Sequence, residues 1–94
     1  MGGYHGSALQ AASRWGYTDI VRLLLENGAD VNTTGGKFGS ALQATSRGGH
    51  TDIVRLLLEN GAEVNTTGGK YESALQAASA KGHTEIVRLL LENG

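Results

Sequence analysis

The apolar residues of the chain gather in blocks that recur every 33 residues. The block Ile20–Leu25 reads Ile-Val-Arg-Leu-Leu-Leu, and the same six residues stand at 53–58 and 86–91. On a helix that turns by about 100° per residue, the five apolar side chains of one block cover an arc of roughly 200°. A helix that is buried on one side only has an apolar stripe of little more than about 100°. The wider arc predicts three helices, each buried between two neighbours.

The polar residues of this helix share the remaining sector. Thr18 is expected to begin the helix and Gly28 to end it, and Asp19, Arg22 and Glu26 fall in one narrow strip between them. Arg22 faces Asp19 at a spacing of three residues and Glu26 at a spacing of four, so the strip can form its own ion pairs. Such pairs stabilise a helix by only about 0.2–0.5 kcal/mol each. We interpret the strip as a solvated outer face and not as a binding site.

A shorter helix is predicted before each long one. Ser7–Gln10 reads Ser-Ala-Leu-Gln, a motif that recurs at 40–43 and 73–76. Ser followed three residues later by Gln predicts a capping box, in which the Ser hydroxyl accepts from the Gln N–H and the Gln side chain accepts from the Ser N–H. Mostly small residues follow, which suits a closely packed inner row of helices. Gly16 is expected to end the first of these helices in the left-handed conformation.

The linker between units, residues 29–39, combines turn formers with β-branched residues. It predicts an extended loop or a short hairpin with Gly35 and Gly36 at its tip.

Residues 2–34 and 35–67 differ at 6 of 33 positions, and 68–94 differs from 35–61 at 6 of 27. A period of this length indicates a stack of supersecondary units. Residues 1–94 are therefore expected to form one domain, made of units 2–34, 35–67 and 68–94.

This unit resembles the ankyrin repeat, through Gly16-Tyr17, Ile20–Leu25 and Gly28–Asn32 and their counterparts in the later units. The resemblance covers essentially the whole chain and implies an all-α solenoid of helix-turn-helix units with protruding hairpin loops. Where the family usually has Thr-Pro-Leu-His, Ser7–Gln10 lacks the proline and the histidine that lock the first turn and connect the loop in typical members. The Ser-Ala-Leu-Gln-Ala-Ala-Ser variant resembles arrays of immune-type receptors of filamentous fungi, and the near-identical units resemble a consensus-like engineered array.

The resemblance implies a non-catalytic module that binds a protein partner along its loop ends and inner helices. Differences between the units gather at these two places, whereas the buried positions and the charged strip hardly vary. Drift without selection would alter both exposed faces, so we interpret the variable positions as a partner-binding surface. Its predicted residues are Tyr4, His5, Arg14, Trp15, Lys37, Phe38, Arg47, Lys70, Tyr71, Glu72 and Lys81.

The residue types on this surface favour an acidic partner. Aromatic residues and Arg dominate binding hot spots, and the Arg and Lys side chains make the surface locally basic although the chain has a net charge of −1. Two alternatives remain open. Exposed positions that nothing constrains also vary, and the aromatic residues at the loop ends (His5, Phe38 and Tyr71) can pack beneath their own loops.

Other function classes find no support in the composition. The chain has no cysteine, which excludes disulfides and thiolate metal sites, and Met1 is not followed by a signal peptide, so the cytoplasm is the expected location. The near-neutral charge gives no case for nucleic acid or a membrane. No histidine or carboxylate set has metal spacing and no nucleophile is paired with a base, so no metal, cofactor or catalysis is expected. His50 and His83 are interpreted as structural. Asn32 and Asn65 match the glycosylation acceptor pattern, but without a signal peptide we interpret them as residues of the repeat loops.

The two ends of the stack are not polar caps. Leu9 and Leu25 at one end and Leu89–Leu91 at the other follow the interior pattern, whereas repeat arrays need polar end units for solubility. We expect end-to-end homo-oligomers or fraying of the last unit.

The leading alternative to a recognition module is an engineered or excised scaffold without an evolved target. Substitution of Arg14 and Trp15 separates the two, because a scaffold has no binding to lose.

Overall fold

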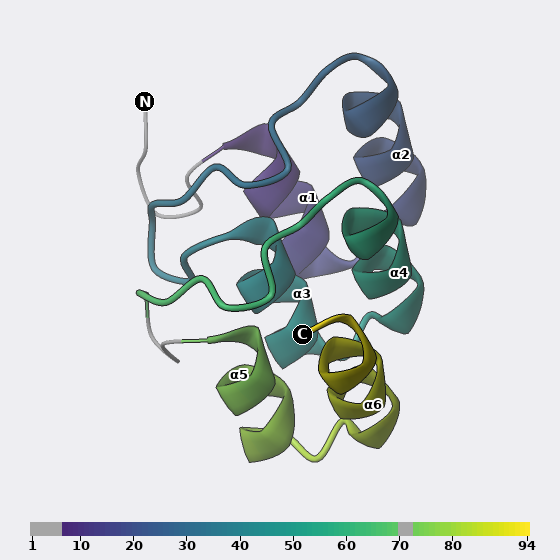
Figure 1. Cartoon of the computed structure of the whole chain (residues 1–94). Helices are drawn as coiled ribbons and strands as arrows, with labels where there is room; N and C mark the ends of the chain where they lie inside the picture. The colour runs from purple at the N-terminus through teal and green to yellow at the C-terminus, as the bar shows by residue number, and fades with distance from the viewer. Residues whose placement is uncertain (1–6, 70–72) are drawn as a thin grey trace.

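The computed structural model describes residues 7–69 and 73–94, and these residues contain two rows of short helices. The helices are α1 (Ala8–Trp15), α2 (Thr18–Glu26), α3 (Ala41–Gly48), α4 (Thr51–Glu59), α5 (Ala74–Ala80) and α6 (Thr84–Asn93). The inner row is α1, α3 and α5, and the outer row is α2, α4 and α6 (Figure 1). Each inner helix packs against the outer helix that follows it and against the next inner helix. The predicted all-α stack of helix-turn-helix units is confirmed.

The helix ends follow the local signals in the sequence. The first two inner helices have complete capping boxes, and in the third the Ser73 hydroxyl accepts from the Gln76 N–H. Gly16 and Gly49 end α1 and α3 in the left-handed conformation, with φ of 80° and 79°. Within the described residues no helix has the length and the apolar content that are needed to cross a membrane.

Between the units, the described parts of the linkers form extended loops without paired strands, the first of the two predicted forms. The loops project away from the outer row (Figure 1). Asn32 connects the first loop to the second, because its Nδ2 donates to the Gly61 carbonyl (3.1 Å) and its Oδ1 accepts from the Glu63 N–H (2.8 Å). Asn32 is therefore a loop residue whose side chain joins two successive loops.

Burial of the outer helices depends on their place in the stack. In α4 the side chains of Ile53 and Leu57 are fully buried, as the wide apolar arc predicts. Helix α2 has the same nine residues in the same order, yet Ile20 is 47% and Leu23 is 58% exposed. At the other end Leu91 of α6 is 64% exposed. Burial on two sides is thus confirmed for the central helix, while α2 and α6 each leave one side open.

Two glycines provide a matched test of how closely the units are stacked. Gly49 and Gly82 have similar φ angles of 79° and 73°. A Cβ atom on Gly49 would lie 2.7 Å from Cε1 of His83, whereas a Cβ atom on Gly82 would meet nothing within 4 Å. Both alanine variants incur a left-handed penalty of roughly 1–2 kcal/mol, and we expect Gly49→Ala to lose about 1 kcal/mol more because of the contact. Urea denaturation followed by circular dichroism measures the difference, and equal losses would contradict close stacking at this point.

Candidate partner-binding surface

Two glutamines of the inner helices hold the loop that follows each unit. Gln10 Oε1 accepts from the Ser7 N–H (2.6 Å), and its Nε2 donates to the carbonyls of Gly35 (3.0 Å) and Gly39. The two carbonyls flank Lys37 and Phe38, so this short segment is fixed over the preceding unit. The glutamine of the Ser-Ala-Leu-Gln motif thereby connects its helix to the loop that follows.

Phe38 lies at the centre of a group of cationic side chains. Phe38 as a whole is only 8% exposed. Cζ of Arg14 lies 4.7 Å from the ring centroid, Cζ of Arg47 lies 5.2 Å from it and Nζ of Lys37 lies 5.6 Å from it. Arg14 also stacks on Trp15, with Cζ 4.2 Å from that ring, and Trp15 is 54% exposed. All four distances are within the range of cation–π attraction, about 6 Å.

The structure revises the role of Phe38. Sequence reasoning placed its ring among the residues that contact a partner, but burial leaves little of the ring accessible. The ring instead supports the guanidinium groups of Arg14 and Arg47, which come from two successive units. The alternative that Phe38 packs beneath its own loop agrees with this burial, and the ring also contacts arginines of α1 and α3.

Two histidines fix the helix ends that carry these arginines. His50 Nε2 lies 3.3 Å from the Arg14 carbonyl oxygen, and His83 Nε2 lies 3.1 Å from the Arg47 carbonyl oxygen. Because a carbonyl oxygen only accepts, Nε2 carries the proton in both rings. Each ring also covers the glycine that ends the preceding inner helix. The structural role predicted for the histidines agrees with these contacts.

Charge is divided between the two rows of helices. The inner helices and their flanking turns (residues 7–17, 35–50 and 73–83) contain four cationic side chains and no acidic one. The outer helices α2, α4 and α6 contain six acidic side chains and three arginines. The net charge of the chain is therefore near zero although its inner side is basic and its outer side is acidic.

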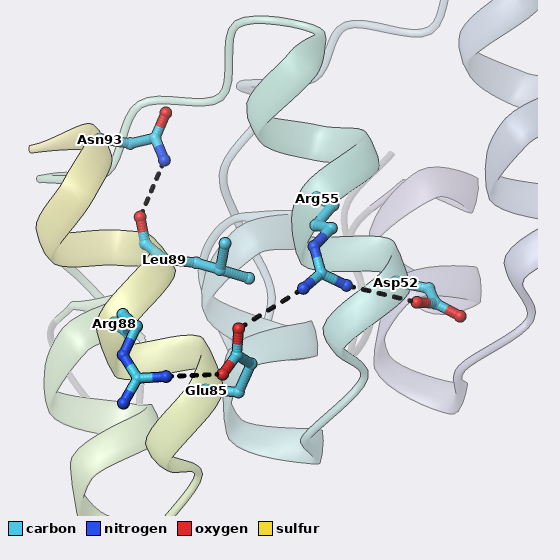
Figure 2. A network of polar contacts seen from close by, with 6 residues as sticks. All are labelled: Asp52, Arg55, Glu85, Arg88, Leu89 and Asn93. Atoms are coloured by element: carbon cyan, nitrogen blue, oxygen red, sulfur yellow. Dashed lines mark hydrogen bonds and ion pairs between the residues drawn. The ribbon is translucent and has the colours of Figure 1, made fainter.

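On the outer side, ion pairs link one unit to the next (Figure 2). Arg55 contacts Asp52 on its own helix (Nη1 to Oδ1, 3.8 Å) and Glu85 on the following one (Nη2 to Oε2, 3.5 Å). Glu85 also accepts from Arg88 (3.1 Å). The arginines of the outer row thus have carboxylate partners, as the sequence spacing predicts for pairs three residues apart.

Two family models match the chain over nearly its full length. Residues 34–94 match a model of ankyrin repeats in three copies, and residues 5–35 match a model of the ankyrin repeat. The chain belongs to the ankyrin repeat family. This is a non-catalytic family, and its arrays are typically protein–protein interaction modules. No curated protein matches the chain.

The ankyrin array brings together part of the predicted surface. Arg14, Lys37 and Arg47 lie around the ring of Phe38, and Trp15 lies against Arg14. We call Arg14, Trp15, Lys37 and Arg47 the basic surface. Five predicted residues lie outside the described part of the chain and have no structural account here. These are Tyr4, His5, Lys70, Tyr71 and Glu72.

Outside the basic surface, Lys81 is exposed at the end of α5.

Sequence reasoning recognised Gln10 and Gln43 as capping residues only. The loop contacts of their Nε2 atoms were missed, although the amide group has donors that a capping box does not use. Among the described residues, no group of three or more His, Asp or Glu side chains is placed to hold a metal ion.

Proposed function

We propose that this ankyrin array is a non-catalytic module that binds an acidic protein partner on the basic surface. The proposal rests on the stacking of Arg14 and Arg47 on the buried ring of Phe38. Stacking covers the faces of a guanidinium group and leaves its edge, where the N–H donors lie, for a carboxylate. The exposed ring of Trp15 adds an apolar contact beside these donors, which is a combination typical of binding hot spots.

The spacing of the cations supports an anionic ligand. The distances from Phe38 put Cζ of Arg14 and Cζ of Arg47 within about 10 Å of each other, which is close to the screening length at 0.1 M salt. Their repulsion is therefore only partly screened, and a carboxylate between them would relieve it. Nε of Arg14 is shielded from solvent and makes no hydrogen bond to the described residues. The outer acidic side of the array would also orient an acidic partner toward the inner side during approach.

Selection of random peptides against the immobilised chain tests the proposal. We expect enriched peptides to combine Asp or Glu with an aromatic residue, and their affinity to fall as salt is raised. Arg14→Gln is expected to weaken binding of an enriched peptide about tenfold or more, because hydrogen bonds between charged groups contribute roughly 1.5–3 kcal/mol. Isothermal titration calorimetry on the purified variants measures this change.

Arg22→Gln is the matched control, because Arg22 is also an arginine of the first unit but lies on the outer row, paired with Asp19. This variant should bind the enriched peptides as the original chain does. Trp15→Ala should lose affinity and retain its helicity, since the ring is more than half exposed. Equal binding by the Arg14 and Arg22 variants would contradict a role for the basic surface.

The alternative is an engineered or excised ankyrin scaffold with no evolved target. Helices α2 and α4 are identical over nine residues, which favours the scaffold. Binding of one partner on the inner side would not by itself keep the outer helices identical. Substitution of Arg14 and Trp15 separates the two functions when binding to proteins of a cell lysate is measured, since a scaffold without a target has no binding to lose. The cytoplasmic location expected from the sequence stays a prediction.

A further inference from the structure

Two shallow grooves follow one another along the outer side of the array. The first lies between α2 and α4 and the second between α4 and α6, and each is lined by an arginine, two leucines, a glutamate and an asparagine. The lining residues are Arg22, Leu25, Glu26, Leu56 and Asn60 in the first groove, and Arg55, Leu58, Glu59, Leu89 and Asn93 in the second. Each residue of the first groove is 33 positions before its counterpart in the second. The same site is therefore presented twice, at two internal junctions of the array.

The leucines form the apolar floor of each groove. In the second groove the side chain of Leu89 extends from α6 toward α4 (Figure 2). All four leucines also pack against the core, which fixes their positions. The volumes of the grooves are similar, about 290 and 260 Å³. Because sites for whole small molecules usually enclose about 300–1,000 Å³, each groove suits a single apolar side chain of a larger ligand.

The arginines on the rim already have carboxylate partners. Nη1 of Arg22 lies 3.7 Å from Oδ1 of Asp19, and Arg55 contacts Asp52 and Glu85 as described above. These pairs reduce the positive charge that either arginine presents to a ligand. The arginines therefore do not select an acidic ligand.

Acceptor groups make up the rest of each rim. Glu26 and Glu59 are exposed, and neither carboxylate is paired with a cation of the described residues. Asn60 and Asn93 each donate Nδ2 to a carbonyl of their own helix at 2.8 Å, and no described residue donates to their Oδ1 atoms. The outer helices contain six acidic side chains and three arginines. Charge and hydrogen bonding thus both favour a cationic ligand.

The spacing of the grooves selects the form of this ligand. Packed helices lie about 8–10 Å apart, and the second groove follows the first by one such step. A chain in the polyproline II conformation turns once in three residues and advances about 9.3 Å in that distance. Side chains three residues apart then share one face and match the grooves, whereas in a β-strand they point to opposite faces. An α-helix needs seven residues for a similar step, and helices shorter than about 12–15 residues are marginal in water.

We propose that the outer side of the array binds an extended, basic segment of a protein partner. Two apolar side chains of the segment, three residues apart, occupy the two grooves, and neighbouring lysines or arginines pair with Glu26 and Glu59. A ligand of this kind also gives the identical outer helices a role, because successive grooves bind the same chemical unit. The basic surface lies on the other row of helices, so this inference does not depend on the acidic partner proposed above.

A fluorescein-labelled peptide of four Leu-Lys-Pro units tests the inference, because proline favours the polyproline II conformation. Fluorescence anisotropy measures its affinity for the purified chain. Glu26→Gln and Glu59→Gln in one chain are expected to weaken binding about fivefold, since two exposed ion pairs are lost. Glu63→Gln and Glu92→Gln together are the matched control, because they remove the same charge at exposed residues that line neither groove. This control should bind within about twofold of the original chain.

Two further peptides test the apolar contacts and their spacing. A peptide of Ser-Lys-Pro units keeps the charge and has no apolar side chain for the grooves. A peptide of the original composition with its leucines placed side by side loses the match in spacing. Both are expected to bind about tenfold more weakly or worse, because a buried leucine contributes roughly 1.5–3 kcal/mol. Undiminished binding of either peptide overturns the inference, and so do equal losses in the two double variants. Tighter binding of a peptide with leucine at every seventh residue would indicate a helical ligand and overturn it as well.

NMR locates the peptide on the array. The side-chain amide signals of Asn60 and Asn93 are expected to shift when the Leu-Lys-Pro peptide is added, whereas the indole N–H signal of Trp15 should not. At about 1 mM peptide even a site with a Kd of about 1 mM is half occupied, so unchanged amide signals at that concentration overturn the inference. Arg14→Gln should give the same shifts although it weakens binding of acidic peptides. Loss of the shifts in this variant would place the peptide on the basic surface and overturn the inference.

Discussion

Ile53→Ala is expected to lower the free energy of unfolding by about 3 kcal/mol, and Ile20→Ala by less than about 1 kcal/mol. The two isoleucines have the same position in helices of identical sequence, so helix propensity and local spacing are equal. They differ in exposure, which is 0% for Ile53 and 47% for Ile20. Truncation at Ile53 removes buried methyl groups and leaves a cavity between two units, whereas the same truncation at Ile20 removes a side chain already half in water. The difference between the variants therefore isolates burial by the preceding unit.

Urea denaturation followed by circular dichroism measures both values under one set of conditions. If Ile53→Ala is too unstable to fold, Ile53→Val provides a milder step with an expected loss of roughly 0.5–1.5 kcal/mol. Ile20→Val should then be nearly neutral. Similar losses at the two positions would show that the central helix does not depend on its neighbour, and the solenoid description would be wrong.

Gln43→Ala is expected to destabilise the chain by about 2–3 kcal/mol, and Gln76→Ala by no more than about 0.5 kcal/mol. Gln43 is 3% exposed. Its Oε1 accepts from the Ser40 N–H (2.7 Å) and its Nε2 donates to the Gly68 carbonyl (2.8 Å). Alanine leaves the buried Ser40 N–H without an acceptor, and a buried donor without a partner costs roughly 1–3 kcal/mol. Gln76 stands in the same tetrapeptide but is exposed, so water can replace its side-chain contacts.

Two measurements check this pair of variants. Urea denaturation gives the stabilities, and hydrogen exchange followed by NMR reports on the Ser40 N–H itself, whose exchange should accelerate in Gln43→Ala. Gln43→Glu separates the two contacts, because a carboxylate accepts from Ser40 but cannot donate to Gly68. Equal stabilities of the Gln43 and Gln76 variants would show that the loop is not held through the amide.

Local and periodic features were predictable from the sequence. The apolar arc of Ile20–Leu25 requires neighbours on two sides whatever those neighbours are, and the capping box of Ser7 with Gln10 lies within four residues. Gly16 ends a helix because its left-handed conformation depends on the residue itself. These features depend on residues that are close in the sequence. The helices could therefore be predicted from local patterns, and their stacking from the repetition of those patterns.

Features that depend on contacts between units were harder to predict. The ring of Phe38 contacts arginines of α1 and α3, and no pattern in the loop itself carries that information. The second role of Gln10 depends on where the next loop passes, 25 and 29 residues later. Sequence reasoning also named Leu9 and Leu25 at the first end, whereas the exposed apolar residues of the described first unit include Ile20 and Leu23.

Each inner helix packs chiefly on the inner helices of the adjacent units, with Arg14 and Arg47 one unit apart on the same side. Duplication or deletion of a whole unit in the gene would preserve every junction that remains. Duplication or deletion of the second unit would also lengthen or shorten the row of arginines by one fixed step, whereas the third unit has Ala80 at this position. An architecture of this kind can adjust its reach along an extended ligand by recombination alone, without first acquiring new residues to rebuild its interior.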